Sequence, residues 1–482
     1  MSKEAALRRN RKDCDELDPE GKWSKLCTML WGKGDQAPLF EAVVIRRSEG
    51  EDRVADAVPS RCWVLSSSLS EVGILDDMLV ETAIIREEYL TAIDDMINVY
   101  VNDTEKEPRK TKRWLGHTVT GQPGIGKSVL LIIILILRLA AGLPTVLIDQ
   151  ADYMTLFIDG KVYSIPMAPL RIIEFFPRHL WILFDSNHDV FTPRSRLLGS
   201  YLFLVQAASP RNERIAWRKK SSIHLWYMKT WTLVELLLGR QFQRTGDVCE
   251  EVYLKLYWSK YAPSARLAYK YGNETTLRRC DKDTQNQIKR LSYDNLYKVF
   301  QDASAHHLQQ DISYHLIRFD PDGDRDPIVK IPTQHLCDMI YSSVLKGSGP
   351  HIANFYSLFL ETSYSKWRIE PLERSFTRKY THWRTYDDAT FATEYLSIKC
   401  SDRGVATLED RVWKVDSLEE ISIKPYNAKS TLDLQSAYYA PMQKNHPSFD
   451  SFLFDAVRGL AIGFQATVGD RHDVKLGGLS WL

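Results

Sequence analysis

Residues 119–139, VTGQPGIGKSVLLIIILILRL, join a glycine-rich turn to a strongly apolar run. The uncharged part of that run covers nine residues, 129–137, and ends at Arg138. A membrane-spanning helix needs about 20 mostly apolar residues, so this run is too short to cross a bilayer. The sequence therefore predicts a helix buried on several sides inside a folded domain, and it indicates no membrane partner.

The turn itself fits the pattern G-x-x-x-x-G-K-[ST]. Glycines permit backbone conformations closed to other residues, so successive amides can point at phosphate oxygens, and the following helix adds its unpaired N–H groups. We expect Lys127 to reach the β- and γ-phosphates of ATP and Ser128 to offer its hydroxyl to Mg²⁺. The predicted cofactor-binding residues of this loop are Gly121, Gln122, Pro123, Gly124, Ile125, Gly126, Lys127 and Ser128.

The chain around the loop alternates short apolar strands with helical segments. Residues 145–149, 180–186 and 200–210 have the pattern of strands, and Asp159-Gly160 between alternating residues predicts a hairpin over 156–165. Strands that alternate with helical connections imply a mostly parallel sheet covered on both faces. The fold class expected here is therefore α/β, a P-loop NTPase.

Two polar residues at predicted strand ends, Asp185 and Ser209, complete the expected nucleotide site. Asp185 ends the strand WILFD, where a carboxylate can hold Mg²⁺ through water. Asp149, after TVLI, competes for this role and ranks lower because its strand directly follows the loop helix. Ser186, and not a glutamate, follows Asp185, so nucleotide binding is better supported than hydrolysis. Ser209 lies where a polar residue often senses the γ-phosphate, and a simple strand stop at Ser-Pro explains it equally well.

Changes in pattern along the chain predict four parts. Residues 1–75 carry no clear period and are expected to form an irregular or partly ordered leader. Residues 76–225 are expected to hold the nucleotide-binding core, preceded by an amphipathic helix over 76–101. Residues 226–344 read as a helical lid and linker, with no strong strand between Leu225 and Phe300, and residues 345–482 as a smaller α+β domain.

Composition restricts partners and location. The formal net charge of +1 means that DNA or RNA would have to be held by local basic patches, for which 108–113 and 217–220 are the candidates. The seven cysteines are scattered without a C-x-x-C pair, which argues against a disulfide framework or a thiolate zinc site. The charged N-terminus has no apolar signal region, so we expect a nuclear or cytoplasmic location.

Several segments together resemble the Crinkler and retrotransposon-hot-spot-like proteins of fungi and other microbial eukaryotes. The tryptophan-rich stretch W-x-x-x-x-W-T-L-x-E-L and the tetrapeptide PSAR make the likeness more specific than the phosphate loop alone. The segments that carry it are AIIREEYLTAI (83–93), the loop with its helix, LWILFDS (180–186), VQAASPRNERIAWRKK (205–220), LWYMKTWTLVEL (225–236) and YAPSAR (261–266).

The resemblance implies an AAA-type or STAND-like P-loop ATPase with a helical lid. In that picture Arg266 reaches the nucleotide from the lid as a sensor arginine, because a guanidinium is always charged and can fork onto a γ-phosphate. A surface arginine on a helix is the alternative. ATPases of the AAA type often assemble in rings, so a homo-oligomer is a further partner that the resemblance allows.

The resemblance also implies a C-terminal nuclease domain of the restriction-endonuclease-like, PD-(D/E)XK type. Glu370 matches the helical acid of that family, and a hairpin formed by 449–454 and 460–467 brings Asp450 close to Gln465. Two carboxylates and an amide oxygen would hold a catalytic Mg²⁺ for phosphodiester cleavage. Gln465 replaces the usual acid and Thr467 stands where lysine is expected, which leaves a degenerate or truncated module open.

The sequence thus supports one leading hypothesis and one alternative. The leading hypothesis is an ATP-dependent protein of the Crinkler type that acts on DNA, RNA or chromatin, as a nuclear or host-directed effector without a conventional signal peptide. The alternative is a STAND-like regulatory ATPase that binds a protein partner and has no nuclease activity. Convergence of the side chains of Glu370, Asp450 and Gln465 distinguishes the two.

Overall fold

The computed structural model describes the first two thirds of the chain almost continuously and selected strands of the rest. It describes residues 14–343 except for 38, 45–60, 79, 81, 106–115, 168–175, 178, 188–191, 195–196, 198–201, 216, 218–222, 244–248, 262–263, 305–315, 322–326 and 341, and beyond these 393–400, 406–413, 423–426, 435, 437–441, 451–455 and 460–464. The chain divides into two compact units, Met1–Phe355 with Lys366–Arg368, and Tyr356–Ser365 with Ile369–Leu482.

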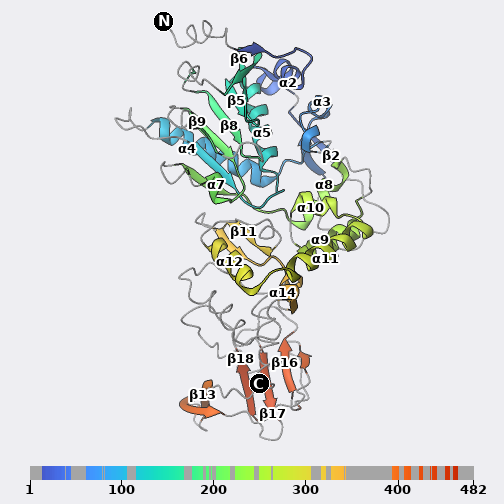
Figure 1. Ribbon diagram of the computed structural model, residues 1–482, viewed down its shortest axis with the longest axis vertical. Coiled ribbons are helices and arrows are strands. Elements are labelled where there is room, and N and C mark those ends of the chain that lie inside the picture. Colours follow the sequence, from blue (N-terminus) through green and yellow to red (C-terminus); the bar gives the residue numbers. More distant parts are fainter. Residues whose placement is uncertain are drawn as a thin grey trace. The chain divides into compact units, whose positions relative to one another are not determined.

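An eight-stranded sheet forms the centre of the first unit, in the order β1-β7-β6-β5-β8-β9-β4-β10 (Figure 1). Strands β5, β8, β9, β4 and β10 run parallel to one another, and β6, β7 and β1 extend the sheet with antiparallel pairs. The predicted α/β fold with a mostly parallel sheet is confirmed. The strands are β1 Asp15–Glu16, β4 Gly116–Thr120, β5 Thr145–Ile148, β6 Tyr153–Ile158, β7 Lys161–Pro166, β8 Trp181–Asp185, β9 Phe203–Ala207 and β10 His224–Tyr227.

The predicted hairpin joins β6 to β7. Its two-residue turn places Asp159 at φ 52° and Gly160 at φ 73°, and positive φ at both positions gives a turn whose twist matches that of the strands. Aspartate and glycine tolerate this conformation better than most residues, which is why the dipeptide is a usable sequence signal.

Helix α5, Lys127–Ala140, contains the apolar run and packs against β5, β8 and β9 (Figure 1). Its residues from Leu130 to Ile136 are all buried, as the sequence predicts. The helix ends beside Arg138, whose buried guanidinium donates to the hydroxyl of Thr145 and to the carbonyl oxygens of Pro144 and His179. None of the helices in the described part of the chain is long and apolar enough to cross a bilayer.

The two faces of the sheet are covered differently. Helices α4, Glu87–Glu105, and α5 share one face, because Tyr100 of α4 packs edge-on against the Trp181 ring and Arg138 of α5 lies 4.5 Å above that ring. Helix α2, Lys22–Leu30, contacts α5 and β7. The opposite face carries a separate apolar cluster that includes Val146, Ile182, Met154 and Leu204, together with Phe176 and Leu197 from connecting segments.

The strand order creates a switch point beside β4. Strand β9 lies between β4 and β8, whereas β10 pairs with the other edge of β4. In open α/β sheets such a reversal leaves a crevice at the carboxyl ends of the strands. The glycine-rich loop follows β4 directly, so it lies at the carboxyl ends of the parallel strands beside this switch point.

The description of residues 1–75 as an irregular leader is wrong for the part that the structure describes. Strand β1 pairs with β7, and α2 packs on the sheet. Strands β2, Phe40–Val44, and β3, Arg61–Leu65, form a two-stranded sheet followed by α3, Ser67–Glu71. Strand β1 and helix α2 are held by contacts with β7 and α5, far along the chain, which a search for local periods does not detect.

The predicted helix over 76–101 begins later than expected, at Glu87. Residues preceding it extend along β3 instead: Leu65 N–H donates to Ala83 O, and Ile85 N–H donates to Trp63 O. The expectation of no strong strand between Leu225 and Phe300 is also wrong at its start, since β10 covers His224–Tyr227 and pairs in parallel with β4. Pairing with a distant strand overrides the helical spacing of both segments.

Helices dominate the remainder of the first unit, as the sequence predicts. A two-stranded hairpin, β11 with β12, lies among them, and Phe319 of β11 stacks on Tyr227 of β10. The elements are α7 Asn212–Ile215, α8 Leu233–Gly239, α9 Glu251–Tyr261, α10 Ala265–Lys270, α11 Glu274–Lys289, α12 Tyr293–Ser304, β11 Arg318–Pro321, β12 Pro327–Lys330 and α14 Gln334–Ile340.

The described part of the second unit is made of strands. Strands β13, Thr393–Cys400, and β14, Ala406–Trp413, form one antiparallel pair. A separate sheet has the order β15-β16-β17-β18, with β15 at Ile423–Tyr426, β16 at Ala437–Pro441, β17 at Ser451–Asp455 and β18 at Leu460–Phe464. The predicted hairpin between the last two strands is confirmed, and its outermost described pair is Ser451 opposite Phe464.

Candidate functional site

The loop between β4 and α5 is a tight turn supported by three glycines. Gly121, Gly124 and Gly126 have φ values of 140°, 77° and 97°, which side chains with a Cβ rarely allow. Gly126 is the residue that caps the N-terminus of α5. Within the described residues, the backbone amides of residues 124–127 donate no hydrogen bond, so these donors can serve a ligand.

Lys127 directly follows this turn and is the first residue of α5. Its ammonium donates to the carbonyl oxygens of Gly121 at 2.9 Å and Gln122 at 2.8 Å. Burial lowers the pKa of Lys127 to about 7, nearby Asp185 acts in the opposite direction, and the cations Arg266 and Arg214 lower the pKa further. An anionic ligand here would restore the charged form of the lysine.

Ser128 and Asp185 meet beside Lys127. The side chain of Ser128 hydrogen-bonds to Asp185, and burial raises the pKa of that carboxyl, while the hydrogen bond and Lys127 lower it. Asp149 ends the neighbouring strand, since Ile148 of β5 is opposite Phe184 of β8, and its charge also raises the pKa of Asp185. The hydroxyl of Ser128 and the carboxylates of Asp185 and Asp149 lie near the carboxyl ends of these two strands, and such oxygen ligands can hold a hard divalent cation.

Two further polar groups lie at the ends of neighbouring strands. The hydroxyl of Ser209, just after β9, is buried and finds no hydrogen-bond partner among the described residues. The hydroxyl of Thr120, the last residue of β4, is also buried and has no hydrogen-bond partner among the described residues. A buried hydroxyl without a partner costs free energy, so both positions are consistent with groups that contact a ligand.

Arg214 is a site residue that sequence reasoning missed. It comes from the short helix α7, donates to Ser186 O at 2.6 Å, and lies close enough to influence the pKa values of both Lys127 and Asp185. The only signal in the sequence is its place in a polar stretch after β9. Nothing in the local spacing distinguishes it from neighbouring Arg211.

Helix α10 packs directly against the loop. Arg266 N–H donates to Gly124 O at 3.3 Å, and the hydroxyl of Ser264 donates to Pro123 O at 3.1 Å. A Cβ on Gly124 would lie only 2.8 Å from the Arg266 Cβ and 2.8 Å from the Ser264 hydroxyl. Ser264 and Arg266 therefore contact the backbone of the glycine-rich loop.

Gly124→Ala is expected to lower the melting temperature clearly more than Gly32→Ala. Both glycines have positive φ, so both variants suffer backbone strain of about 1–2 kcal/mol, but a Cβ on Gly32 meets nothing within 4 Å. The close approach of α10 should add about 1 kcal/mol or more at Gly124. Thermal unfolding of both variants checks this, and equal losses would mean that α10 does not press on the loop.

A second set of buried contacts holds the loop at Ile125 and Gly126. The carbonyl oxygen of Ile125 accepts from Arg86 at 3.2 Å and from the Trp231 indole at 2.8 Å. Arg86 also pairs with Glu235 at 2.8 Å, and the Tyr89 hydroxyl lies where a Cβ on Gly126 would be. The segments 83–93 and 225–236, which carry part of the family resemblance, thus meet at the loop.

The remaining loop positions have structural partners. The side-chain amide of Gln122 donates to Ile317 O at 2.8 Å, which connects the loop to the segment entering β11. The side chain of Ile125 is fully buried. Glu370, Asp450 and Gln465 lie outside the described residues, as do the basic runs 108–113 and 218–220. No protein-family model and no curated protein matches this chain.

Proposed function

We propose that this chain is a P-loop NTPase of the AAA or STAND-like type that binds ATP with Mg²⁺ at the loop after β4. The observation that carries the proposal is the meeting of Lys127, Ser128 and Asp185 at a turn whose amides at residues 124–127 are available. A cation, a hydroxyl, a carboxylate and a set of backbone donors are the groups that a metal-bound triphosphate needs.

The surrounding residues have separate roles in this proposal. Lys127 leaves the Gly121 and Gln122 carbonyl oxygens and contacts the β- and γ-phosphates, Ser128 binds Mg²⁺, and Asp185 holds the ion through water. Ser209, Arg214 and Arg266 face the end of the phosphate chain. Guanidinium groups suit this position because they remain charged and offer several donors.

Slow turnover is part of the proposal. Ser186, and not a glutamate, follows Asp185, and it is a buried residue whose carbonyl oxygen accepts from Arg214. Asp149 is the carboxylate that the geometry places beside Asp185, which makes it our candidate for orienting the attacking water. A neutral serine offers no general base of comparable strength.

Nucleotide-dependent movement of α10 is the output that the contacts favour. Ser264 and Arg266 bind the carbonyl oxygens of Pro123 and Gly124, so a change in loop conformation would be transmitted to this helix. A ligand shifts such an equilibrium only through different contacts in the two states, and the Arg266 guanidinium supplies one. This supports a switch, the property shared by the Crinkler-type reading and the STAND-like alternative.

We extend the proposal to nucleic acid as the target, with the second unit as a Mg²⁺-dependent nuclease of Crinkler type. The register of β17 and β18, in which Ser451 is opposite Phe464, supports the hairpin that this reading requires. If the proposal holds, DNA accelerates ATP turnover and the protein nicks DNA with Mg²⁺.

The test compares the wild-type protein with Asp450→Ala, which should lose nicking while keeping ATP turnover, because the carboxylate would bind the nuclease metal and not the nucleotide. Asp455→Ala, at the other end of β17, is the matched control and should keep both activities. If intact protein that binds ATP cuts neither DNA nor RNA with any divalent metal, the regulatory switch that binds a protein partner replaces the nuclease proposal.

A further inference from the structure

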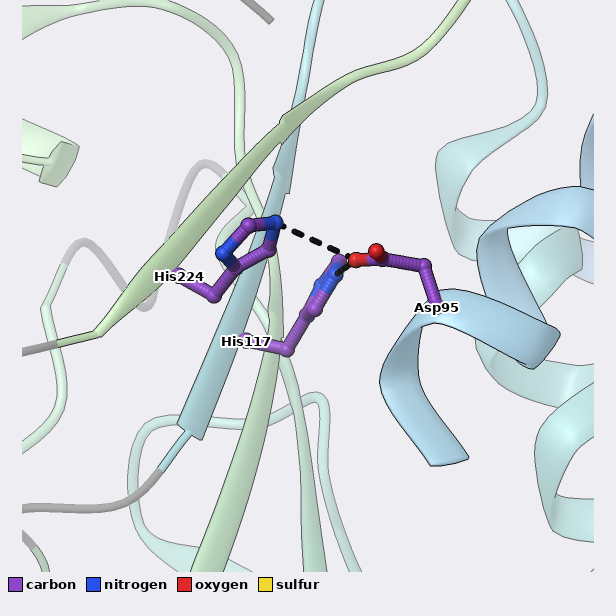
Figure 2. Close-up of side chains that lie close together, drawn as sticks. All are labelled: Asp95, His117 and His224. Atoms are coloured by element: carbon purple, nitrogen blue, oxygen red, sulfur yellow. Dashed lines mark hydrogen bonds and ion pairs between the residues drawn. The ribbon is translucent and has the colours of Figure 1, made fainter. Parts of the chain in front are cut away.

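Three side chains that the nucleotide site does not use converge on one point in the first unit. The Asp95 carboxylate oxygen Oδ2 lies 2.9 Å from His117 Nε2 and 3.1 Å from His224 Nε2 (Figure 2). One potential ligand atom from each residue lies within 4.8 Å of the other two. Within the described part of the chain, no other group of three or more His, Cys, Asp or Glu side chains comes together in this way.

The fold explains why these residues meet. His117 and His224 are direct partners in the parallel pair of β4 and β10, so their side chains lie on the same face of the sheet, with ring centroids 5.0 Å apart. Helix α4 packs on β4 and directs Asp95 toward both rings (Figure 2). No local spacing in the sequence relates the three residues, which is why sequence reasoning did not find them.

Burial differs across the group in a way that suits a bound ion. The side chain of His117 is fully buried, whereas those of Asp95 and His224 are 13% and 20% exposed. Water can therefore reach the group on the side of Asp95 and His224. An ion held by three protein ligands could complete its coordination with one water on that side, without exposing the inner histidine.

We propose that Asp95, His117 and His224 bind a divalent first-row transition-metal ion, for which Zn²⁺ is the best match. Zinc accepts imidazole nitrogen at about 2.0–2.1 Å and carboxylate oxygen at about 2.0–2.2 Å, which places tetrahedral ligand atoms about 3.4 Å apart. The separations of 2.9 and 3.1 Å need to open by only a few tenths of an ångström. Mg²⁺ prefers oxygen ligands and would not compete.

The ion would act as a structural clip. It would join α4, β4 and β10. Strand β4 leads directly into the glycine-rich loop, and the loop contacts Arg86, just before α4, and Tyr89, in the first turn of α4. His117 is near the start of β4 and the loop follows its end, so the metal and the nucleotide would occupy different places. The inference therefore does not depend on ATP binding.

The test titrates ZnCl₂ into chelator-treated, full-length protein by calorimetry, with His224→Gln and Asp95→Asn as variants. The wild type should bind one Zn²⁺ per chain, and each variant should lose at least tenfold in affinity. His179→Gln, which removes an exposed histidine outside the group, is the control and should keep wild-type affinity. Circular dichroism verifies that each variant is folded.

Thermal unfolding gives a second readout. Zn²⁺ at 100 times its Kd should raise the ratio of folded to unfolded wild-type and His179→Gln protein about 100-fold, with a higher Tm, and should not do so for His224→Gln. Absence of Zn²⁺ binding by the wild type would overturn the proposal. Equal affinity in folded wild type, His224→Gln and Asp95→Asn would also overturn it, since the ion would then be bound elsewhere, for example by cysteines.

Discussion

Lys127→Ala is expected to weaken Mg²⁺–ATP binding about a hundredfold or more. The ammonium of Lys127 can donate to two phosphate groups, and each charge-assisted hydrogen bond contributes about 1.5–3 kcal/mol. A loss of about 3 kcal/mol corresponds to roughly two powers of ten in Kd. Titration with a fluorescent ATP analogue measures the change, and Lys289→Ala on the exposed surface of α11 is the matched control, with unchanged affinity.

The same lysine gives the binding a predicted pH dependence. The pKa of Lys127 is about 7 in the ligand-free site, so above pH 7 the free protein carries a neutral lysine and ATP binding must take up a proton. The affinity for ATP should therefore fall as pH rises from 7 to 9. Wild-type affinity in Lys127→Ala, or affinity that is flat with pH, would contradict the assigned role.

Asp185→Asn is expected to abolish the gain in ATP affinity that Mg²⁺ provides and to lower turnover about a hundredfold or more. The substitution keeps the shape of the side chain and removes the negative charge beside Ser128 and Lys127. A bound Mg²⁺ contributes several kcal/mol of charge stabilisation in phosphoryl transfer, and without Asp185 the site would hold that ion poorly. Binding of ATP in the presence of a chelator should change little, because the amides and Lys127 are intact.

Asp149→Asn is the matched comparison for this prediction. Asp149 ends the neighbouring strand, but the structure gives Ser128 a hydrogen bond to Asp185, which is why we assign the metal to Asp185. Asp149→Asn should keep Mg²⁺-dependent binding and lose mainly turnover. Measurement of affinity against Mg²⁺ concentration separates the two carboxylates, and the reverse order of effects would exchange their roles.

Local signals predicted the centre of the sheet well. The apolar run of α5, the strand that ends at Asp185 and the Asp159-Gly160 hairpin all depend on residues close together in the sequence, and each forms the predicted element. Side-chain period and turn chemistry act over a few residues, so they can be read without knowing the fold.

Contacts between distant segments could not be predicted in this way. Strand β10 has only four residues and is stabilised by pairing with β4, which lies far earlier in the chain. Arg86 reads as part of an amphipathic segment, and only the fold shows its bonds to Ile125 and Glu235. Arg214 likewise has no motif around it. Tertiary contacts, and not local preference, determine these positions.

Hydrogen exchange at the backbone amides of residues 124–127, with and without saturating Mg²⁺–ATP, tests the central claim most directly. These amides donate no hydrogen bond within the described residues, and in the proposed nucleotide complex they donate to phosphate oxygens. At a Mg²⁺–ATP concentration that saturates the wild type but lies well below the weakened Kd of Lys127→Ala, we predict at least tenfold slower exchange in the wild type and nearly unchanged exchange in the variant. Unaltered exchange at these amides in wild-type protein held at saturating Mg²⁺–ATP would contradict the account.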